Sequence, residues 1–480
     1  MAGDRNRARI RVRRDVPVWP VRVILVAARR WGIIGAQPTN RRLPSPPINP
    51  LQSWRRATRA LGRWFHPPND AVHNERMLYL QVIPQGLFMG GAAAFVDVFL
   101  VRLGAPSWVV SLNASLPALV MMLAVLPLGA VVQRRARLLF DFNLSRILNR
   151  TAYTLMALLP FLSPALAPLA LVALNASAAL PAAVQNVCFT TVIAKATPPD
   201  RRARVLSVRW AVMGVSTALT GLLVGHWLDS VAFPLNYQVL FATSILAALG
   251  TAYLVSKLRL PPETPPAVQG RRAVDLRHIW QLVADAPGFR GYMTARILVQ
   301  LGMSLGVGLL PLYRVRVLGA SDAWLGVLLT VQNITQVGSY LALGRLLRRS
   351  AFRRHLWLSV LGMALMPLTT ALATRPEMLL LPALIIGVFG AALNVFITDS
   401  LIADSPEEHL SLFVSVNQFV LQAISFVGPL LGAALAGATS IRLALTLASG
   451  VRIVGGLAFW WLGRQKGEPA APRQDPAGDT

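Results

Sequence analysis

Cysteine is almost absent from this chain of 480 residues, because Cys188 is the only one. A single thiol excludes a disulfide framework, a zinc site built on thiolates and an iron–sulfur cluster. The six histidines show no HExxH or comparable ligand spacing, and no glycine-rich loop ends in Lys-Ser or Lys-Thr. We therefore expect no metal site, no cofactor and no ATP hydrolysis through that loop motif.

Charged residues are also scarce. Asp, Glu, Lys and Arg make up 14% of the chain and hydrophobic residues 54%, with a mean hydropathy of +0.53. A soluble domain carries about a quarter charged residues, so this chain has too little polar surface to coat a soluble body of its size. The same composition excludes disorder outside the tails. The sequence therefore predicts an integral membrane protein with many spans.

Acidic residues are outnumbered by basic ones, 20 to 47, which gives a formal net charge of +27. Nearly all the basic residues are arginines, and they lie at the ends of apolar segments and in the N-terminal tail. That distribution is typical of a membrane protein oriented by positive charge. It argues against nucleic acid as a partner.

The N-terminal tail, residues 1–76, contains 16 arginines and no apolar run of spanning length. Between residues 51 and 65 apolar residues recur at helical spacing with arginines between them. This pattern predicts an interfacial helix lying on anionic lipid. The alternatives are a disordered basic tail or a start codon assigned too far upstream.

Beyond residue 76 the chain contains twelve apolar stretches of about 20 residues, the length that spans a bilayer as a helix. They lie near residues 78–102, 107–131, 147–164, 167–192, 205–227, 236–256, 291–313, 322–346, 353–373, 377–399, 411–436 and 442–463. Lys and Arg concentrate in the loops after the second, fourth, sixth and eighth stretches. Both termini are therefore predicted to be cytoplasmic. The loop after the tenth stretch is acidic and departs from the pattern.

An internal repeat divides the chain into halves. Leu103-Gly104-Ala105 recurs as Leu318-Gly319-Ala320, an offset of 215. The same offset relates Gln85 to Gln300, Gly129 to Gly344 and Arg134 to Arg349. We therefore predict two six-helix bundles joined by a proline-rich loop. The predicted segments are a basic cytoplasmic tail (1–76), an N-terminal bundle (77–256), a central cytoplasmic loop (257–290), a C-terminal bundle (291–463) and a cytoplasmic tail (464–480).

The loop after the second span carries a recognisable motif, reading Gly129-Ala-Val-Val-Gln133-Arg134-Arg135-Ala136-Arg137, with a weaker copy from Gly344 to Arg349. With the six-plus-six layout, this motif resembles the major facilitator superfamily over about residues 75–465. The resemblance implies an all-α membrane fold of twelve helices in two pseudo-symmetric bundles that rock around a central cavity. It also implies that the motif residues Gly129, Gln133, Arg134, Arg137, Gly344 and Arg349 form a cytoplasmic gate. The family's acidic residue is Gln133 here, which cannot form an ion pair.

Polar residues inside the spans are the candidates for binding a solute, because they are costly in lipid and tend to line cavities. The predicted cavity residues are Gln85, Asn186, Arg296, Gln300, Gln332, Asn333, Asn394, Gln418 and Gln422. The alternative for each Asn or Gln is a hydrogen bond that holds helices together.

Charged residues within spans are rarer still. Asp97 is the candidate proton carrier, with an ion pair to Arg102 as the structural alternative. Arg452 falls near the middle of the last span, and a structural partner such as Gln422 is the preferred explanation.

These features favour a secondary active transporter for a small solute in the cytoplasmic membrane of a bacterium, and we expect it to be monomeric. Proton coupling is a further hypothesis, and export of a drug-like solute or metabolite is slightly favoured. The alternatives are an uptake carrier for a sugar or organic acid, and a sensor or scaffold that docks partners through the basic tail. A GxSxG match from Gly302 to Gly306 lies inside a span, where the strained turn of a nucleophilic serine cannot form. We therefore do not expect an enzyme.

Overall fold

The computed structural model describes residues 69–134, 137–260, 281–346 and 356–465. The predicted interfacial helix at 51–65 lies outside these residues, as do most of the central loop and the C-terminal tail. Contacts divide the chain into two units, Met1–Val72 and His73–Thr480. The fold below is that of the second unit.

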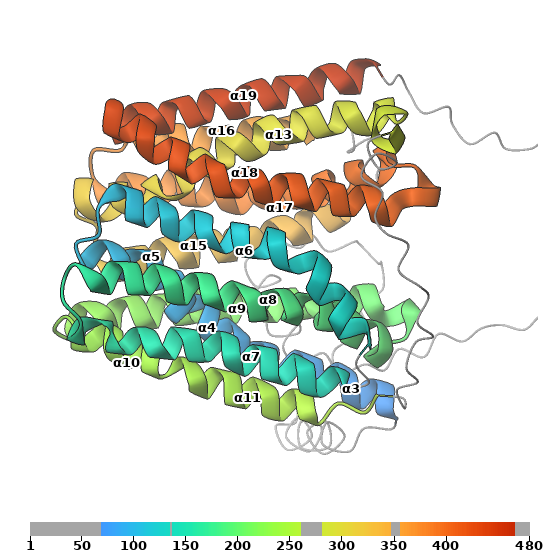
Figure 1. Cartoon of the computed structure of the whole chain (residues 1–480), viewed down its shortest axis with the longest axis horizontal. Coiled ribbons are helices and arrows are strands. Elements are labelled where there is room, and N and C mark those ends of the chain that lie inside the picture. The colour runs from blue at the N-terminus through green and yellow to red at the C-terminus, as the bar shows by residue number, and fades with distance from the viewer. Residues whose placement is uncertain (1–68, 135–136, 261–280, 347–355, 466–480) are drawn as a thin grey trace, which may run out of the picture. The chain divides into compact units, whose positions relative to one another are not determined.

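The N-terminal half of this unit forms six helical segments, each spanning one predicted apolar stretch. They are α3 (Asp70–Leu80) with α4 (Val82–Gly90) and α5 (Ala92–Arg102); α6 (Ser107–Arg134); α7 (Leu138–Leu155) with η1 (Met156–Phe161); α8 (Leu166–Ala196); α9 (Pro199–Ser230); and α10 (Leu235–Ala242) with α11 (Ser244–Ser256). Helices α7, α8, α4, α9 and α11 pack against one another as a bundle (Figure 1).

The C-terminal half repeats this arrangement. Its segments are α13 (Pro287–Val307) with α14 (Leu309–Leu312) and η2 (Tyr313–Val317); α15 (Asp322–Leu346); α16 (Leu356–Leu372); η5 (Pro376–Leu379) with α17 (Leu380–Asp404); η6 (Glu407–His409) with α18 (Leu410–Ala438); and α19 (Ile441–Gln465). The two halves pack along each other through α6 on α18 and α9 on α15. The described residues contain no strand, so the predicted all-α fold is confirmed.

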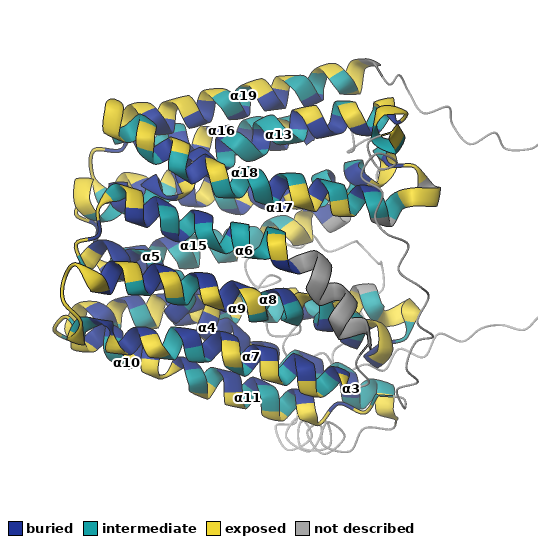
Figure 2. Ribbon diagram, in the orientation of Figure 1, coloured by how far each residue is buried: buried dark blue, intermediate teal, exposed yellow. Residues whose placement is uncertain are grey.

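The surface of this body is apolar. Leu223, Leu246 and Leu372 are each more than 60% exposed. Exposed residues alternate with buried ones along the helices (Figure 2). Large exposed apolar area requires lipid around it. Within the described residues nine helices are long and apolar enough to cross a membrane. The number of twelve crossings stays a prediction.

Glycines of the internal repeat adopt the same conformation in both halves. Gly104 has φ 84° and Gly319 has φ 65°, values that a residue with a side chain rarely adopts. Each ends the first segment of its half and turns the chain into the second. The repeat in the sequence therefore corresponds to an equivalent turn in the structure.

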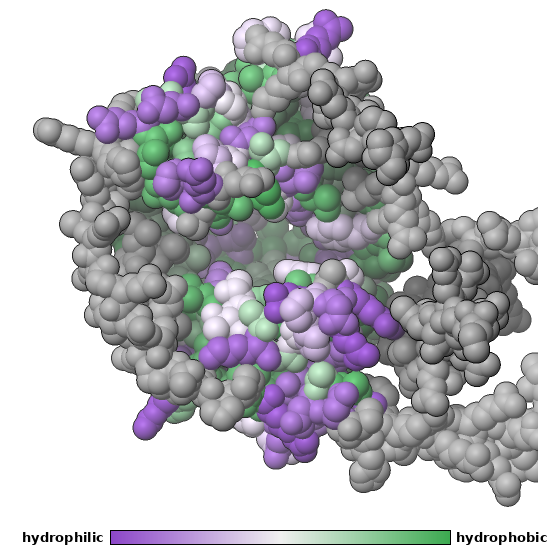
Figure 3. Space-filling view, turned by 90° about the vertical axis from the view of Figure 1, so that its right-hand side faces the viewer, coloured by the Kyte–Doolittle hydropathy of each residue, from purple (hydrophilic) through white to green (hydrophobic). Residues whose placement is uncertain are grey.

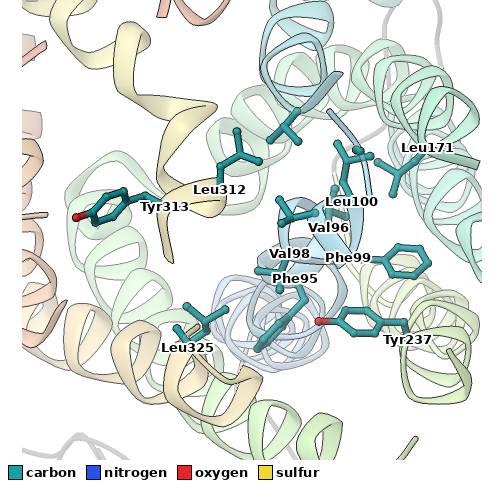
Figure 4. Packing of buried hydrophobic residues seen from close by; sticks show 14 of the residues in the cluster. Phe95, Val96, Val98, Phe99, Leu100, Leu171, Tyr237, Leu312, Tyr313 and Leu325 are labelled. Carbon is teal, nitrogen blue, oxygen red and sulfur yellow. The ribbon is translucent and has the colours of Figure 1, made fainter. Parts of the chain in front are cut away.

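Three apolar cores show how the halves meet. The first joins both halves, with Phe95, Phe99 and Tyr237 from one and Leu312 and Leu325 from the other (Figure 4). The second core, around Phe289 and Phe413, belongs to the C-terminal half alone. The third, around Phe142 and Val192, belongs to the N-terminal half alone. The halves thus share a core at one end of the unit, the closed end, near residues 103–106 and 318–321, and have separate cores at the other, the open end.

Candidate functional site at the interface of the two bundles

The closed end is held by a charged network between the halves. Arg102, in the last turn of α5, donates from Nε and Nη2 to Asp322 Oδ1 at 3.1 and 2.8 Å. The Tyr237 hydroxyl donates to Asp322 Oδ2 at 2.9 Å. Asp229 of α9 accepts the backbone N–H groups of Asp322 and Ala323 at 2.9 and 3.0 Å. Asp229 therefore caps α15 from the opposite bundle, because the first N–H groups of a helix have no partner within it. We call Arg102, Asp229, Tyr237 and Asp322 the closed-end network.

In a second connection, the C-terminal half donates hydrogen bonds to the N-terminal half. Arg316 of η2 donates from Nη2 to the carbonyl oxygen of Ala105 at 2.6 Å and that of Val101 at 3.3 Å. Each half therefore extends an arginine from the end of its first segment to the other half. The two arginines are not equivalent in the repeat, because Arg102 directly precedes Leu-Gly-Ala whereas Val317 separates Arg316 from it.

Small residues let the bundles approach closely beside the closed-end network. A Cβ on Gly326 of α15 would lie 2.3 Å from the carbonyl oxygen of Gly221 of α9. A Cβ on Gly225 would lie 2.5 Å from the carbonyl oxygen of Asp322. The Thr330 hydroxyl donates across the same contact to the Ala218 carbonyl at 2.7 Å. Helices α9 and α15 are therefore in backbone contact here, which no larger side chain would permit.

A cavity of about 270 Å³ lies between the bundles next to the closed-end network. Its charged and polar lining residues are Asp97 of α5, Arg314 of η2 and Gln332 of α15. The remaining lining is almost wholly apolar and includes Ala94 and Leu328. Viewed from the open end, the molecule is hollowed between its halves (Figure 3). The cavity is thus formed by one segment of the N-terminal bundle and several of the C-terminal bundle.

Asp97 is held by a chain of amide and hydroxyl groups. Asn113 of α6 donates to Asp97 Oδ1 at 2.7 Å. Asn175 of α8 donates to Asn113 Oδ1 at 3.0 Å, and the Tyr153 hydroxyl donates to Asn175 Oδ1 at 3.4 Å. The ion pair considered between Asp97 and Arg102 is not formed, because Arg102 points to Asp322 in the other half.

Arg314 is a cavity residue that the sequence analysis missed. The predicted span ended at residue 313, whereas η2 continues the helix to Val317 as a turn of π-helix. Such turns are frequently found at functional sites. Arg314 lines the cavity, whereas Arg316 contacts the other bundle. The available signal was an arginine directly after the predicted end of the span, followed by a second two residues later.

The predicted cavity residues divide into three groups. Gln332 lines the cavity. Asn186, Asn394 and Gln418 are exposed, and Asn394 donates to the Tyr340 hydroxyl at 3.4 Å. Three residues bond within their own bundle: Gln85 accepts from Arg150 at 2.9 Å, Gln300 donates to Ser425 at 2.8 Å, and Asn333 donates to the Leu329 carbonyl at 2.8 Å. Contact of any of these with a solute stays a prediction.

The remaining residues that the sequence singled out are Arg296, Gln422 and Arg452. Arg296 lies against Tyr292, and its Nε and Nη1 are buried without a partner. Gln422 is partly buried. Arg452 donates to the carbonyl oxygens of Met363 at 2.9 Å and Met303 at 3.5 Å, so the preferred partner Gln422 was wrong.

Ser304 is described in full, whereas the gate motif is described only in part. Ser304 of the GxSxG match packs against Gly428 of α18, as expected for helix packing. Arg137 is exposed just before α7. The side chains of Gly129, Gln133, Arg134 and Gly344 and the whole of Arg349 lie outside the described residues.

Comparisons with known proteins agree with this geometry. Residues 292–479 match the family model of the Major Facilitator Superfamily. A bacterial homologue of the human lysosomal transporter Spinster, in an inward-facing and unoccupied conformation, is 14% identical, with a TM-score of 0.58 over 82% of this chain and 96% of that one. The nucleoside transporter NupG is 12% identical, with a TM-score of 0.60 over 82% of this chain and 100% of that one. A POT family transporter in complex with a thioalcohol-conjugated peptide is 12% identical, with a TM-score of 0.60 over 82% of this chain and 96% of that one. No curated protein matches the chain.

These likenesses are to transporters with the same two-bundle fold. The match to the Major Facilitator Superfamily model covers the C-terminal half of the chain, and the solved structures show the same fold over most of its length. At such low identities the solved structures show the fold alone.

Proposed function

We propose that the protein is a secondary transporter that moves a small solute through the cavity between its bundles by alternating access. The observation that carries the proposal is the distribution of the cores: one is shared at the closed end, and two are separate at the open end. Bundles with their own cores can rock as rigid bodies around a shared contact. A solute bound in the cavity would then face each side of the membrane in turn.

The test is the accessibility of the cavity from each side. Ala94 lines the cavity, and Cys188 is the only native cysteine. We would label an Ala94→Cys variant in a Cys188→Ser background with a membrane-impermeant maleimide, added to one side of sealed vesicles and then to the other. A transporter should react from both sides. Reaction from the open-end side alone would contradict alternating access and favour the sensor or scaffold alternative.

A cross-link across the closed end supplies the control. A Cβ on Gly308 would lie 3.1 Å from Ser111 Cβ of the other bundle, close to the separation of about 3.5–4.5 Å that a disulfide requires. Oxidising a Ser111→Cys, Gly308→Cys pair should abolish labelling of residue 94 from the closed-end side only, and a reductant should restore it. Ser111→Cys alone should leave the labelling unchanged. Gly308→Cys alone is tight, because its Cβ would lie 2.8 Å from Ser111 Cα, so the reduced double variant is the baseline for the oxidised one.

We further propose that Asp97 couples transport to protons. A carboxylate inside a membrane cavity can carry a proton between two exposed states, and Asp97 is the acidic residue lining this cavity. In proteoliposomes at saturating solute, the number of protons moved per solute exchanged should fall to zero in Asp97→Asn. Proton movement that persists in this variant would refute the coupling. The direction of proton flow would also test the slight preference for export.

A further inference from the structure

The cavity presents one negative and one positive side chain from opposite bundles. Asp97 extends from α5 and Arg314 from η2, and the lining between them is mostly apolar. No ion pair joins the two in the described part of the chain. Two opposite charges therefore face the same small space without neutralising each other directly.

The carboxylate of Asp97 has one oxygen available. Asn113 donates to Oδ1, and among the described residues nothing donates to Oδ2. A carboxylate with two oxygens accepts about four hydrogen bonds. A cationic donor within the cavity would thus find an acceptor that Asn113 and Asn175 already hold in place.

The guanidinium of Arg314 lacks a partner. Its Nε is buried without a hydrogen bond, and no carboxylate or carbonyl among the described residues accepts from the side chain. Arg316, two residues later, donates to Ala105, and Arg452 to Met363. Arg314 is partly buried, and Nε of Arg452 is also buried without a partner. The terminal nitrogens of Arg452 donate to carbonyls, however, whereas no nitrogen of Arg314 has an acceptor in the described part of the protein, which is costly where it is buried.

We propose that the cavity binds a small zwitterion, with its ammonium group at Asp97 and its carboxylate at Arg314. The inference rests on the proposed transport function and specifies the class of solute. A ligand with one charge leaves the opposite side chain uncompensated, whereas a zwitterion satisfies both. The two charged ends of the zwitterion would contact different bundles, so the bound solute would bridge the interface at which the bundles move.

The first test uses the wild-type protein. Linear ω-amino acids with two to seven methylenes would be compared by calorimetry with the carboxylic acid and the amine of the same length. At the best length, the zwitterion should bind at least 10-fold more tightly than either single-charge analogue. Equal affinity of the acid or the amine, or binding of none of the three at any length, would overturn the proposal. No variant needs to fold for this comparison.

Substitutions then assign the charges. Asp97→Asn should remove the preference for the zwitterion over the acid, and Arg314→Gln should remove its preference over the amine. Arg314→Lys should keep most of the preference. The control is Arg290→Gln, which changes an exposed arginine of α13 that donates to the Ala284 carbonyl. An unchanged preference in Arg314→Gln, or a loss in Arg290→Gln, would refute the assignment.

The two proposals can fail separately. If Ala94→Cys is labelled from both sides but zwitterions are not preferred, the transport proposal stands and the proposed solute class is refuted. If zwitterions are clearly preferred but Ala94→Cys is labelled from one side alone, the protein binds zwitterions and the transport proposal is refuted.

Discussion

Removing Arg102 should open the closed end. The side chain of Asp322 is 4% exposed and that of Arg102 is 31% exposed. An ion pair between exposed residues contributes up to about 1 kcal/mol, whereas removing one partner of a buried pair costs about 3–5 kcal/mol. This pair lies between the two cases, so Arg102→Ala should destabilise the closed end by about 2 kcal/mol. At ~1.4 kcal/mol per factor of ten, the ratio of opened to closed molecules should rise roughly 30-fold.

The assay is a distance distribution between spin labels on the two bundles. Trp108 lies in the first turn of α6 and Leu443 in the first turn of α19, and both are exposed at the closed end. Labels there, in a Cys188→Ser background, would report both populations. Arg102→Ala, Asp322→Asn and the double variant form a cycle whose coupling energy isolates the pair. A change of less than about threefold in Arg102→Ala, or strictly additive effects in the cycle, would refute the reasoning.

Two further predictions concern packing. Gly326→Ala should reduce solute flux at least several-fold, since its Cβ would meet the Gly221 carbonyl and overpacking costs about 1–3 kcal/mol. Gly338→Ala on the same helix has nothing within 4 Å and should be neutral. Arg452→Ala should lower the unfolding temperature in detergent through the space it leaves beside Gly302. Arg452→Met should leave that temperature unchanged or raise it, since an apolar side chain of similar size removes a buried charge. Equal effects of the two Arg452 variants would contradict this account.

The sequence predicted the fold well because its signals are local. Hydropathy locates each apolar stretch, and the repeated Leu-Gly-Ala turn relates the halves. Its glycines, Gly104 and Gly319, are needed for their backbone angles in both halves. The extension of the first C-terminal span through η2 was missed, because hydropathy falls at Arg314 although the helix continues.

The site was predicted less well, because helix rotation decides which polar residues face the cavity. Asp97 and Gln332 line it, whereas Gln85 bonds to Arg150 inside its own bundle. Polarity within a span does not distinguish these cases. The pairing of Arg102 with Asp322, 220 residues apart in sequence, required the relative placement of the bundles.

The π-helical turn η2 has one arginine in the cavity and another on the opposite bundle. Arg314 borders the space where a solute would bind, and Arg316 holds the carbonyl of Ala105. Under the proposed binding of a zwitterion, occupancy of the cavity and closure of the closed end are linked through the five residues of η2. Such linkage is reciprocal. If solute binding shifts the equilibrium toward the closed end by some factor, closure of that end raises the affinity for the solute by the same factor. Variants that destabilise the closed end should thus weaken solute binding, although the substituted residue does not contact the solute.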